Sequence, residues 1–289
     1  MPRSVDSALA LIESVKDYRV LFVGDTIIDE YHYVTPLAKS PKENLVPVRY
    51  DSHEVFRGGV EAAANHARTF CATVDISSHG RITRKVRMID STYMRKLFEV
   101  HYRDGIAIQH AWHDNYDVTI LTDFGHGDLI KSERQLFCDS IGFLAVSAQT
   151  NSANVGYNLI TQYPRADYIV IDEPEARLAA ADRDSPIEEV IERLAIGRCS
   201  KFIVTRGTEG AIGFDGAHFA RLPAMTKSVV DTMGAGDAFF AVTAPMAKTG
   251  SIEDLLLIGN AAGAMKCSIV GHRTSVTKPD LIAYLKALP

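Results

Sequence analysis

The sequence DTMGAGDAFFAV, at residues 231–242, carries the clearest functional signal in the chain. Its two glycines allow a tight turn that can approach a ligand closely, and the apolar run after them predicts a buried helix. The free N–H groups at the start of that helix, with the positive end of its dipole, favour a phosphate group in the turn. A carboxylate in the first helical turn could accept the proton of a hydroxyl group that attacks the phosphate. The spacing therefore favours Asp237 as a general base.

A purely structural role is the alternative for the same stretch. Asp231 or Asp237 would then only cap the helix, and the glycines would serve only a turn. The pattern Asp-Thr-x-Gly-Ala-Gly-Asp nevertheless resembles the signature of the PfkB, or ribokinase-like, sugar kinases at every fixed position. The resemblance implies that an anion hole is formed by the amides of Gly234, Ala235 and Gly236. It also implies that Asp237 is the catalytic base.

Short apolar runs recur along the chain at intervals that leave room for crossover helices. They lie at residues 19–23, 118–121, 142–146, 168–171 and 202–204. This rhythm predicts an α/β fold with a mostly parallel central sheet and helices on both faces. With 46% hydrophobic residues over 289 positions, the chain can form one large domain, which we expect to span residues 1–289. The resemblance implies the ribokinase-like, three-layer version of this fold.

Two further patterns predict antiparallel strands. Residues 31–57 and about 85–111 alternate loosely between polar and apolar residues, which is typical of exposed antiparallel strands. We interpret them as a small β flap, or lid, inserted into the main domain. Exposed strand edges of this kind could also pair to form a homodimer. Nearer the C-terminus, Asp215-Gly216 between two apolar runs predicts a hairpin with a type I′ turn, so that the central sheet would end antiparallel.

The resemblance extends to the part of the chain that would hold the sugar. The sequence GDTIID at residues 24–29 is similar to the opening motif of the family, and this similarity implies that Asp29 contacts sugar hydroxyl groups. A turn residue at the end of a strand is the alternative. Gly58 and Gly59 resemble the glycine pair that lets the sugar lie against the backbone. Relatives often carry an asparagine early in the next helix, where this chain has Glu61.

A second glycine turn resembles the nucleotide site of the family. The sequence TRGTEG at residues 205–210 is similar to a turn that receives the ATP phosphates and adenosine, which implies that Thr205, Gly207 and Gly210 bind the cofactor ATP. Asn260 matches a position beside the adenine. Taken alone, a glycine turn before a hairpin is more often structural, and a helical asparagine is commonly only solvated.

The resemblance also suggests a metal site. Relatives carry Asn-x-x-Glu, a motif tied to magnesium and phosphate handling, where this chain has DEPE at residues 172–175. Asp172 and Glu175 are therefore the candidates for organising Mg²⁺ through water, because oxygen ligands suit that ion. Aspartate in place of asparagine adds a negative charge, and we expect it to alter metal affinity.

A narrower resemblance points to the substrate. The sequences KSPKENLVPV at residues 39–48 and LTDFGHG at residues 121–127 are similar to segments of the heptose 7-phosphate kinases, the kinase half of bifunctional heptose enzymes. This similarity implies a sugar phosphate as substrate. The basic residues that could bind its phosphate through charge-assisted hydrogen bonds are Lys39, Lys42, Arg84, Lys85 and Arg87. A solvated, charged edge strand is an equally good interpretation of these residues.

Composition gives no reason to expect a macromolecular partner. The net charge is −5 and the pI is about 6.1, so neither nucleic acid nor an anionic membrane is favoured. The cysteines are widely separated without a metal-binding spacing, and no segment has the length of a spanning helix or a signal core. We therefore expect a cytoplasmic protein whose partner is a small sugar or sugar phosphate. Gly24-Asp25-Thr26 stands where a dinucleotide-binding glycine fingerprint would begin, which argues against an oxidoreductase of that type.

Together these motifs predict an ATP-dependent sugar kinase that transfers the γ-phosphoryl group of MgATP to a hydroxyl group of a sugar or a heptose 7-phosphate-like sugar phosphate. The alternative is a non-catalytic nucleotide- or sugar-binding protein on the same fold. Two departures suggest it: Asp172, and residues 147–153, which are polar and uncharged where the heptose kinases carry an Asp-Pro-Lys segment. No nucleotidylyltransferase segment follows in this sequence, so we expect that activity in another protein if a heptose pathway applies.

Overall fold

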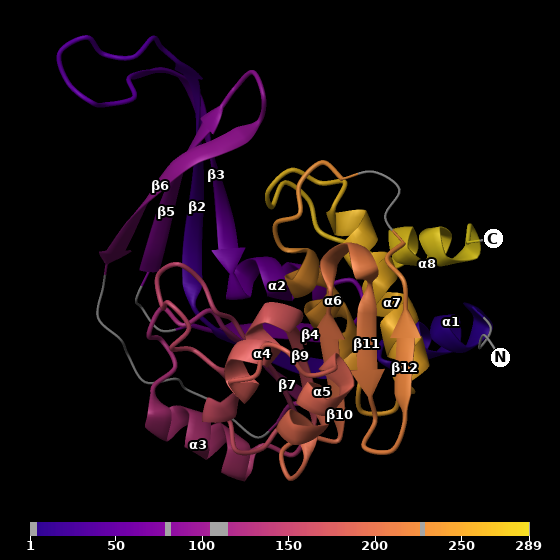
Figure 1. Ribbon diagram of the computed structural model, residues 1–289. Coiled ribbons are helices and arrows are strands. Elements are labelled where there is room, and N and C mark those ends of the chain that lie inside the picture. The colour runs from indigo at the N-terminus through magenta and orange to yellow at the C-terminus, as the bar shows by residue number, and fades with distance from the viewer. Residues whose placement is uncertain (1–4, 79–81, 105–114, 226–228, 289) are drawn as a thin grey trace.

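The central sheet has eight strands in the order β12-β11-β10-β9-β8-β7-β1-β4 (Figure 1). A computed structural model describes residues 5–78, 82–104, 115–225 and 229–288 of the chain. The strands of this sheet are β1 (Arg19–Gly24), β4 (Thr73–Ser77), β7 (Val118–Asp123), β8 (Leu144–Ala148), β9 (Tyr168–Asp172), β10 (Lys201–Thr205), β11 (Ala211–Phe214) and β12 (Phe219–Leu222). All neighbours from β4 to β10 pair in parallel, and β10-β11 and β11-β12 pair antiparallel. The prediction of a mostly parallel sheet with an antiparallel end is confirmed.

Alternate residues of the central strands point to opposite faces, and helices bury both faces. Val20 and Phe22 of β1 belong to one hydrophobic core, while Leu21 and Val23 belong to the other. The first core is closed by α1 (Val5–Ser14), α2 (Val60–Ala67), α6 (Ala235–Thr243), α7 (Ile252–Lys266) and α8 (Lys278–Lys286). The second is closed by α3 (Lys131–Ser140), α4 (Glu173–Ala180) and α5 (Ile187–Ala195). Short 3₁₀ helices lie at η1 (Ile160–Gln162), η2 (Gly207–Glu209) and η3 (Ala244–Met246).

These layers confirm the predicted three-layer α/β fold. The helices bury their apolar residues in the two cores, one on each face of the sheet, as the alternation of the strands requires. Within the described ranges, no helix combines the length and the apolar character that a bilayer span needs.

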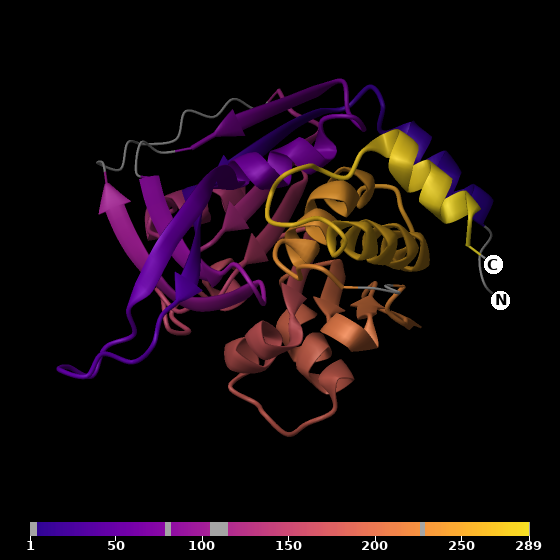
Figure 2. The same cartoon turned by 90° about the horizontal axis from the view of Figure 1, so that it is seen from above.

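The lid is a second, four-stranded sheet that extends away from the C-terminal helices (Figure 2). Its strands run in the order β3-β2-β5-β6 and comprise β2 (Thr26–Pro36), β3 (Val48–Gly59), β5 (Ile82–Asp90) and β6 (Arg95–Asp104). The outer pairs are antiparallel, but β2 and β5 pair in parallel, so the expectation of purely antiparallel strands was wrong. The parallel pair arises because helix α2 and strand β4 carry the chain back between β3 and β5.

The lid strands also begin earlier than the ranges 31–57 and 85–111 suggested. Asp25 alone separates β1 from β2, so the first lid strand continues almost directly from the core. Residues 105–111 of the expected lid lie outside the described residues. The carboxyl ends of the parallel strands meet at the edge of the central sheet that adjoins the lid, where binding sites of open α/β sheets are usually found.

One turn differs from its prediction. In the hairpin between β11 and β12, Gly216 has a φ of 92°, whereas Asp215 is not among the described residues with positive φ. The Asp215 side chain instead accepts hydrogen bonds from the backbone N–H groups of Ala217 and His218, at 3.0 and 2.7 Å. Asp215 therefore stabilises the loop with its carboxylate, and the turn is not of type I′.

Candidate active site

The glycine turn at the start of α6 leaves backbone amides free for a ligand. Gly234 occupies the N-cap position with φ 74°, a left-handed conformation that glycine adopts without strain. The Ala238 N–H donates to the Gly234 carbonyl at 2.9 Å and begins the helix, whereas the N–H groups of Gly236 and Asp237 donate to no group in the described part of the chain. A Cβ added at Gly236 would meet no atom within 4 Å. The open space lies beside Gly236, which fits a phosphate. The Ala235 N–H donates to the Thr232 carbonyl at 3.3 Å, so the amides available to a ligand are those of Gly236 and Asp237 and not the full predicted set of Gly234, Ala235 and Gly236.

Asp237 lies in the first turn of α6, as predicted, and is half-buried. Its Oδ1 accepts a hydrogen bond from Nε2 of Gln149. Burial raises the pKa of Asp237, while the charge of His272 and the Gln149 hydrogen bond act in the opposite direction. A carboxyl group with a raised pKa is a stronger base once it is ionised, which suits it to accept a proton.

Sequence reasoning missed Gln149, which directly follows β8. From the sequence, residues 147–153 stand out only because they are polar and uncharged where the heptose kinases carry an Asp-Pro-Lys segment. The position of Gln149 in the sequence could have identified it, because a polar residue directly after a buried parallel strand lies at the edge of the sheet where ligands bind. The Gln149 backbone carbonyl accepts a hydrogen bond from Nδ2 of Asn154 at 3.0 Å, which helps to fix its position.

Asp29 and Arg87 lie side by side on the lid. Arg87 of β5 donates to Oδ1 of Asp29 on β2, and its Nε donates to Oε2 of Glu99 at 3.1 Å. Nε2 of His272 lies 3.5 Å from Oδ2 of Asp29. Burial acts to raise the pKa of Asp29, but the His272 hydrogen bond and the Arg87 charge outweigh it, so the pKa is lowered. Asp29 is therefore an ionised acceptor at the cleft, as its predicted role requires.

His272 was not singled out from the sequence, yet it connects Asp29 on the lid to the glycine turn. A Cβ placed on Gly234 would lie 3.4 Å from Cε1 of His272. The lid contacts the same region through the Tyr31 hydroxyl, 3.0 Å from Sδ of Met233, and through Glu54, which pairs with Arg273 at 2.7 Å. His272 therefore lies beside both the Asp29 carboxylate and the turn that carries Asp237.

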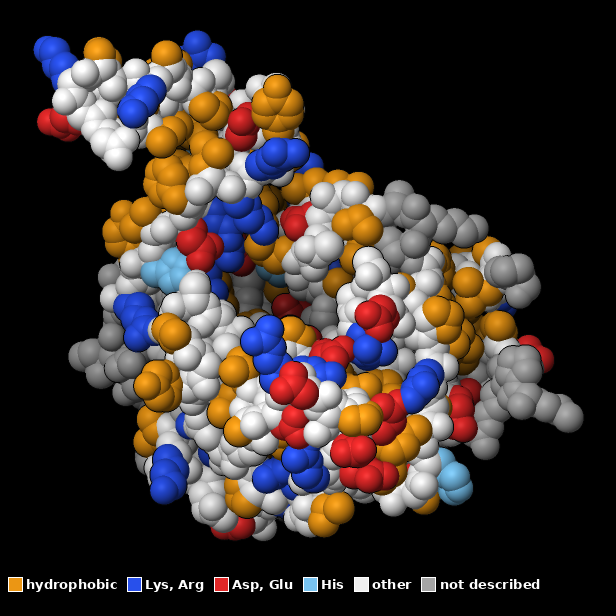
Figure 3. Space-filling view, viewed as in Figure 1, with side chains coloured by type: hydrophobic (Ala, Val, Ile, Leu, Met, Phe, Trp, Pro, Cys, Tyr) orange, Lys and Arg blue, Asp and Glu red, His pale blue; other side chains and the backbone are white. Residues whose placement is uncertain are grey.

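A cleft is visible between the lid and the main body in Figure 3, with basic and acidic side chains around it. Gly58 and Gly59 are the last two residues of β3, where this strand leads into α2. A Cβ on Gly58 would lie 2.5 Å from Oδ2 of Asp29, and one on Gly59 would collide with the Asp25 carbonyl. Both positions therefore require glycine, and they bring the backbone close to Asp29. The predicted contact of this backbone with a sugar stays a prediction.

The basic residues predicted to bind a phosphate fall into separate places. Lys39 and Lys42 are exposed in the loop between β2 and β3, at the tip of the lid (Figure 1). Arg87 pairs with Tyr31 in the sheet register, and Tyr31 lies five residues before the end of β2. Along the direction of β2, roughly 16 Å of strand therefore separates Arg87 from the start of that loop. The structure thus does not bring Lys39 together with Arg87, and the charge of Arg87 is already paired with Asp29 and Glu99.

Lys85 and His126 are two buried basic groups near Asp29. Lys85 pairs with Asp29 in the sheet register, is 9% exposed, and forms no ion pair within the described ranges. His126 is 2% exposed, and neither of its ring nitrogens has a hydrogen-bond partner among the described residues. Burial and the nearby charge of Lys85 lower the pKa of His126 to about 3, so its ring is neutral. A neutral imidazole keeps one N–H donor for a ligand.

Two of the predicted nucleotide residues, Gly210 and Asn260, meet at the end of β12. Gly207 has φ 56° with no atom within 4 Å of an added Cβ, so its surface is open. A Cβ on Gly210 would collide with the Leu222 carbonyl, and Nδ2 of Asn260 lies 3.5 Å from the same carbonyl. Thr205 ends β10 beside this turn. Gly210 and Asn260 thus approach the same carbonyl, and Thr205 and Gly207 adjoin Gly210 along the chain, while their role in binding a nucleotide stays a prediction.

Asp172 and Glu175 are close together, but most of their oxygen atoms are already used. Asp172 caps α4 by accepting from the Glu175 N–H at 2.7 Å, and Glu175 accepts from the N–H groups of Asp172 and Thr150 at 2.9 and 2.8 Å. Burial and the neighbouring Asp172 raise the pKa of Glu175 to about 8. In the described part of the chain, no group of three or more acidic, His or Cys residues could hold a metal. The pair fits Mg²⁺ only through water, by way of the exposed Asp172 carboxylate.

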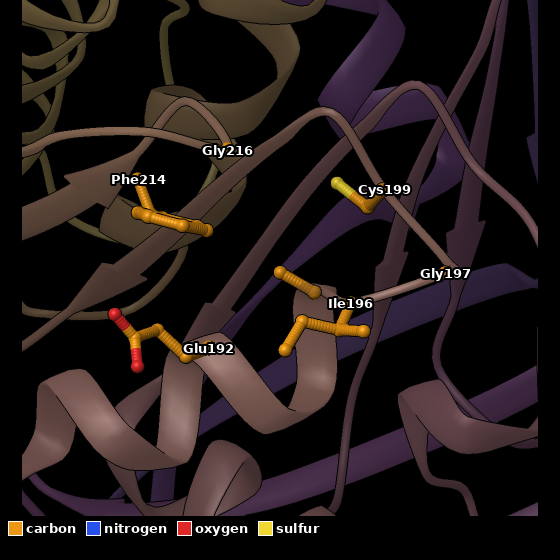
Figure 4. Close-up of a pocket in the computed structure, with 7 residues that line it drawn as sticks. Glu192, Ile196, Gly197, Cys199, Phe214 and Gly216 are labelled. Carbon is orange, nitrogen blue, oxygen red and sulfur yellow. The ribbon is translucent and has the colours of Figure 1, made fainter.

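A separate pocket of about 480 Å³ lies far from this chemistry (Figure 4). Its lining includes Ile196, Cys199 and Phe214, next to the amino end of β10 and therefore at the opposite edge of the sheet. Burial raises the pKa of the Cys199 thiol to about 12, which makes it a poor nucleophile. None of the predicted site residues lines this pocket.

Comparison with known proteins identifies relatives of this arrangement. Residues 148–279 match the family described as pfkB family carbohydrate kinase. A ribokinase of Lactococcus lactis subsp. lactis (strain IL1403) is 31% identical over 124 residues, which cover 42% of this chain and 39% of the ribokinase. The bifunctional protein HldE of Yersinia pestis (strain Pestoides F) is 28% identical over 309 residues, which cover 90% of this chain and 63% of that HldE protein. The chain thus spans less than two thirds of the length of these curated relatives.

The fold has solved counterparts. The structure of Arabidopsis thaliana ribokinase complexed with ribose and ATP superposes with a TM-score of 0.65 at 15% identity and covers 94% of this chain and 100% of that chain. At this identity the likeness shows the fold alone, and it confirms the ribokinase-like architecture implied by the resemblance.

Proposed function

We propose that this protein, in which residues 148–279 match the pfkB carbohydrate kinase family, transfers the γ-phosphoryl group of MgATP to a hydroxyl group of a sugar or sugar phosphate. The observation that carries the proposal is the position of Asp237. Its carboxylate lies in the first turn of α6, next to amides that have no partner among the described residues, and His272 connects this turn to the ionised Asp29. A base, an anion hole and a hydroxyl-orienting carboxylate are what this reaction needs.

In this mechanism, Asp237 accepts the proton of the attacking hydroxyl group. Gln149 holds one oxygen of the carboxylate, so the other oxygen is free to face the substrate. The amides of Gly236 and Asp237 stabilise negative charge that develops on the transferred group, because they need not reorganise during the reaction. MgATP, when bound, supplies the phosphoryl group and the metal charge that neutralises its oxygens.

The sugar would bind between the lid and the turn. Asp29 would accept hydrogen bonds from its hydroxyl groups, and Gly58 and Gly59 would let the ring approach the backbone. Thr205, Gly207, Gly210 and Asn260 would hold the nucleotide, and Asp172 would contact Mg²⁺ through water, with Glu175 holding Asp172 in place. The lid would exclude water, which otherwise competes for the phosphoryl group.

A phosphorylated acceptor such as a heptose 7-phosphate is the finer part of the proposal. The similarity to HldE proteins supports it, as do Lys85 and His126, whose donors have no partner among the described residues near Asp29. An ammonium group and an imidazole N–H are suitable partners for a phosphate. Arg87 would act through Asp29 and Glu99, and Lys39 could reach a substrate only if the lid changed shape.

Two further predictions stay proposals. We propose a cytoplasmic location from the composition and a homodimer formed through the lid. The lid carries exposed apolar side chains, among them Val55, Phe98 and Val100, which would be covered in such a pair.

The test is a phosphoryl-transfer assay with MgATP against sugars and their 1-, 6- and 7-phosphates, with Asp237→Asn as the control. We expect turnover of one class of acceptor by the unchanged protein and its loss in the variant. Bound ATP without transfer to any acceptor would instead favour the non-catalytic binding protein on the same fold.

A further inference from the structure

A lysine is buried directly beneath the glycine turn. Lys266, the last residue of α7, is 0% exposed, which is rare for a charged side chain. Its Nζ donates to the carbonyl oxygens of Gly271 at 2.7 Å, Met233 at 2.8 Å and Ile269 at 3.5 Å. In the described part of the chain, no carboxylate lies within ion-pair distance of this ammonium group. Its three N–H donors match three backbone carbonyls.

The three contacts identify the protonation state of this lysine. A neutral amine has only two N–H groups, so three acceptor oxygens around Nζ call for the ammonium form. Burial lowers the pKa of Lys266, and the charges of Asp231 and Asp237 oppose that effect. The carbonyls and these carboxylates therefore compensate for the lost hydration of the charge.

Lys266 and Asp231 hold the same two backbone segments from opposite sides. The Asp231 carboxylate accepts from the N–H groups of Met233 and Gly271, each at 3.0 Å. The Lys266 ammonium group donates to the carbonyls of these same two residues. Met233 directly precedes Gly234, and Gly271 directly precedes His272, so this arrangement fixes both the anion hole and the histidine that faces Asp29.

We propose that Lys266 is a positioning residue. Its buried ammonium group shapes the turn at residues 233–236 and places a positive charge next to that turn. The catalytic part of this inference rests on the proposed kinase function. The structural part rests only on the carbonyl cage, which is formed around Nζ by the backbone carbonyls of Met233, Ile269 and Gly271. It follows that removing the side chain leaves a cavity lined by carbonyl oxygens. A free ammonium ion has the charge and donors of the missing group.

The structural part is tested by melting Lys266→Ala in ammonium chloride and in choline chloride at equal concentration. We expect ammonium to raise the melting temperature of this variant by about 2 °C or more relative to choline. The matched control is Lys201→Ala, because Nζ of Lys201 donates to a single backbone carbonyl, that of Ala247, at 2.6 Å. An equal ammonium effect in both variants and the unchanged protein, or none in any, would overturn the proposal.

If Lys266→Ala is recovered unfolded, refolding it in the two salts makes the same comparison. Folded protein from ammonium alone supports the cage, and equal yields from both salts contradict it. Lys266→Met, which keeps the volume of the stem and fills the cavity, should show no ammonium effect.

The catalytic part is tested with the acceptor found in the transfer assay. We expect Lys266→Ala to lower kcat roughly 10- to 100-fold with little change in KM, because a displaced turn misaligns the reacting groups. Ammonium should restore part of kcat, and an unchanged kcat in choline would overturn a positioning role. Ammonium-specific melting without any kinase activity in the unchanged protein would support the cage and refute the proposed function instead.

Discussion

The glycine turn and the lid reach the same cleft by different physical routes. The turn is built from neighbours in sequence: Gly234 supplies the left-handed conformation, and the Asp231 carboxylate binds the Met233 N–H two residues on. The lid presents Asp29 and Arg87 from different strands, and their pairing depends on the register of β2 and β5. A short motif is therefore enough to define the turn, whereas the lid side chains acquire their roles only when distant strands pair.

Asp237→Asn tests the turn and should have the largest effect. Asparagine keeps the size of the side chain but cannot accept the proton, so we expect kcat to fall roughly 10²- to 10⁴-fold. Nucleotide binding, measured by calorimetry, should change little because the amides remain. Asp139→Asn, an exposed carboxylate on α3, is the matched control and should keep the full rate. A variant at position 237 with undiminished kcat would show that the turn only caps a helix.

Asp29→Asn tests the lid and should have the next largest effect. The change removes the charge that accepts from Arg87 and His272, so we expect kcat/KM for the sugar to fall roughly 10- to 100-fold, with KM for ATP nearly unchanged. Melting should be measured in parallel, because breaking a buried ion pair also costs stability. An equal rise of both KM values would contradict a separate sugar side of the cleft.

The fold could be predicted because its signals are local. Each apolar run of the central sheet is buried on both faces, so the runs at residues 118–121 and 168–171 were recognisable as parallel strands without any partner in view. The parallel pairing of β2 with β5 could not be predicted, because α2 and β4 lie between them and no local pattern encodes that return.

The site shows the same limit. Asp237 and the glycines were found from their spacing, but Gln149, His272 and Lys266 come from other parts of the chain and acquire their roles only through contacts. The spacing of Asp172 and Glu175 was compatible with two interpretations, a metal site and a helix cap. An acidic residue followed by glutamate three positions later is also the pattern of a capping box, and the structure uses it in that way.

Lys85→Gln and Lys39→Gln sharpen the comparison within the lid itself. Lys85 is buried near Asp29, so its loss should raise KM for a phosphorylated acceptor roughly tenfold and leave KM for the unphosphorylated sugar unchanged. Lys39 is exposed at the tip, and its change should alter either KM less than about twofold. Equal effects of the two variants would mean that the lid closes far enough to bring its tip to the substrate.

Gln149→Leu should have the smallest effect, and it depends on pH. Asp237 must be ionised to accept a proton, and burial raises its pKa, so the acid limb of kcat/KM should lie above the ordinary aspartate value of 3.8. The Gln149 hydrogen bond lowers this pKa by favouring the charged form, and its removal should move the acid limb to higher pH. The ratio of variant to unchanged kcat/KM should therefore be lowest at acid pH and rise to a plateau, with a loss below about tenfold near pH 8. Gln135→Leu, which removes an exposed amide bound to Asp139 on α3, should leave the profile unchanged. A ratio that stays constant over the whole pH range would show that Gln149 positions the carboxylate without changing its pKa. In that case the glycine turn, without help from Gln149, would set the basicity of Asp237.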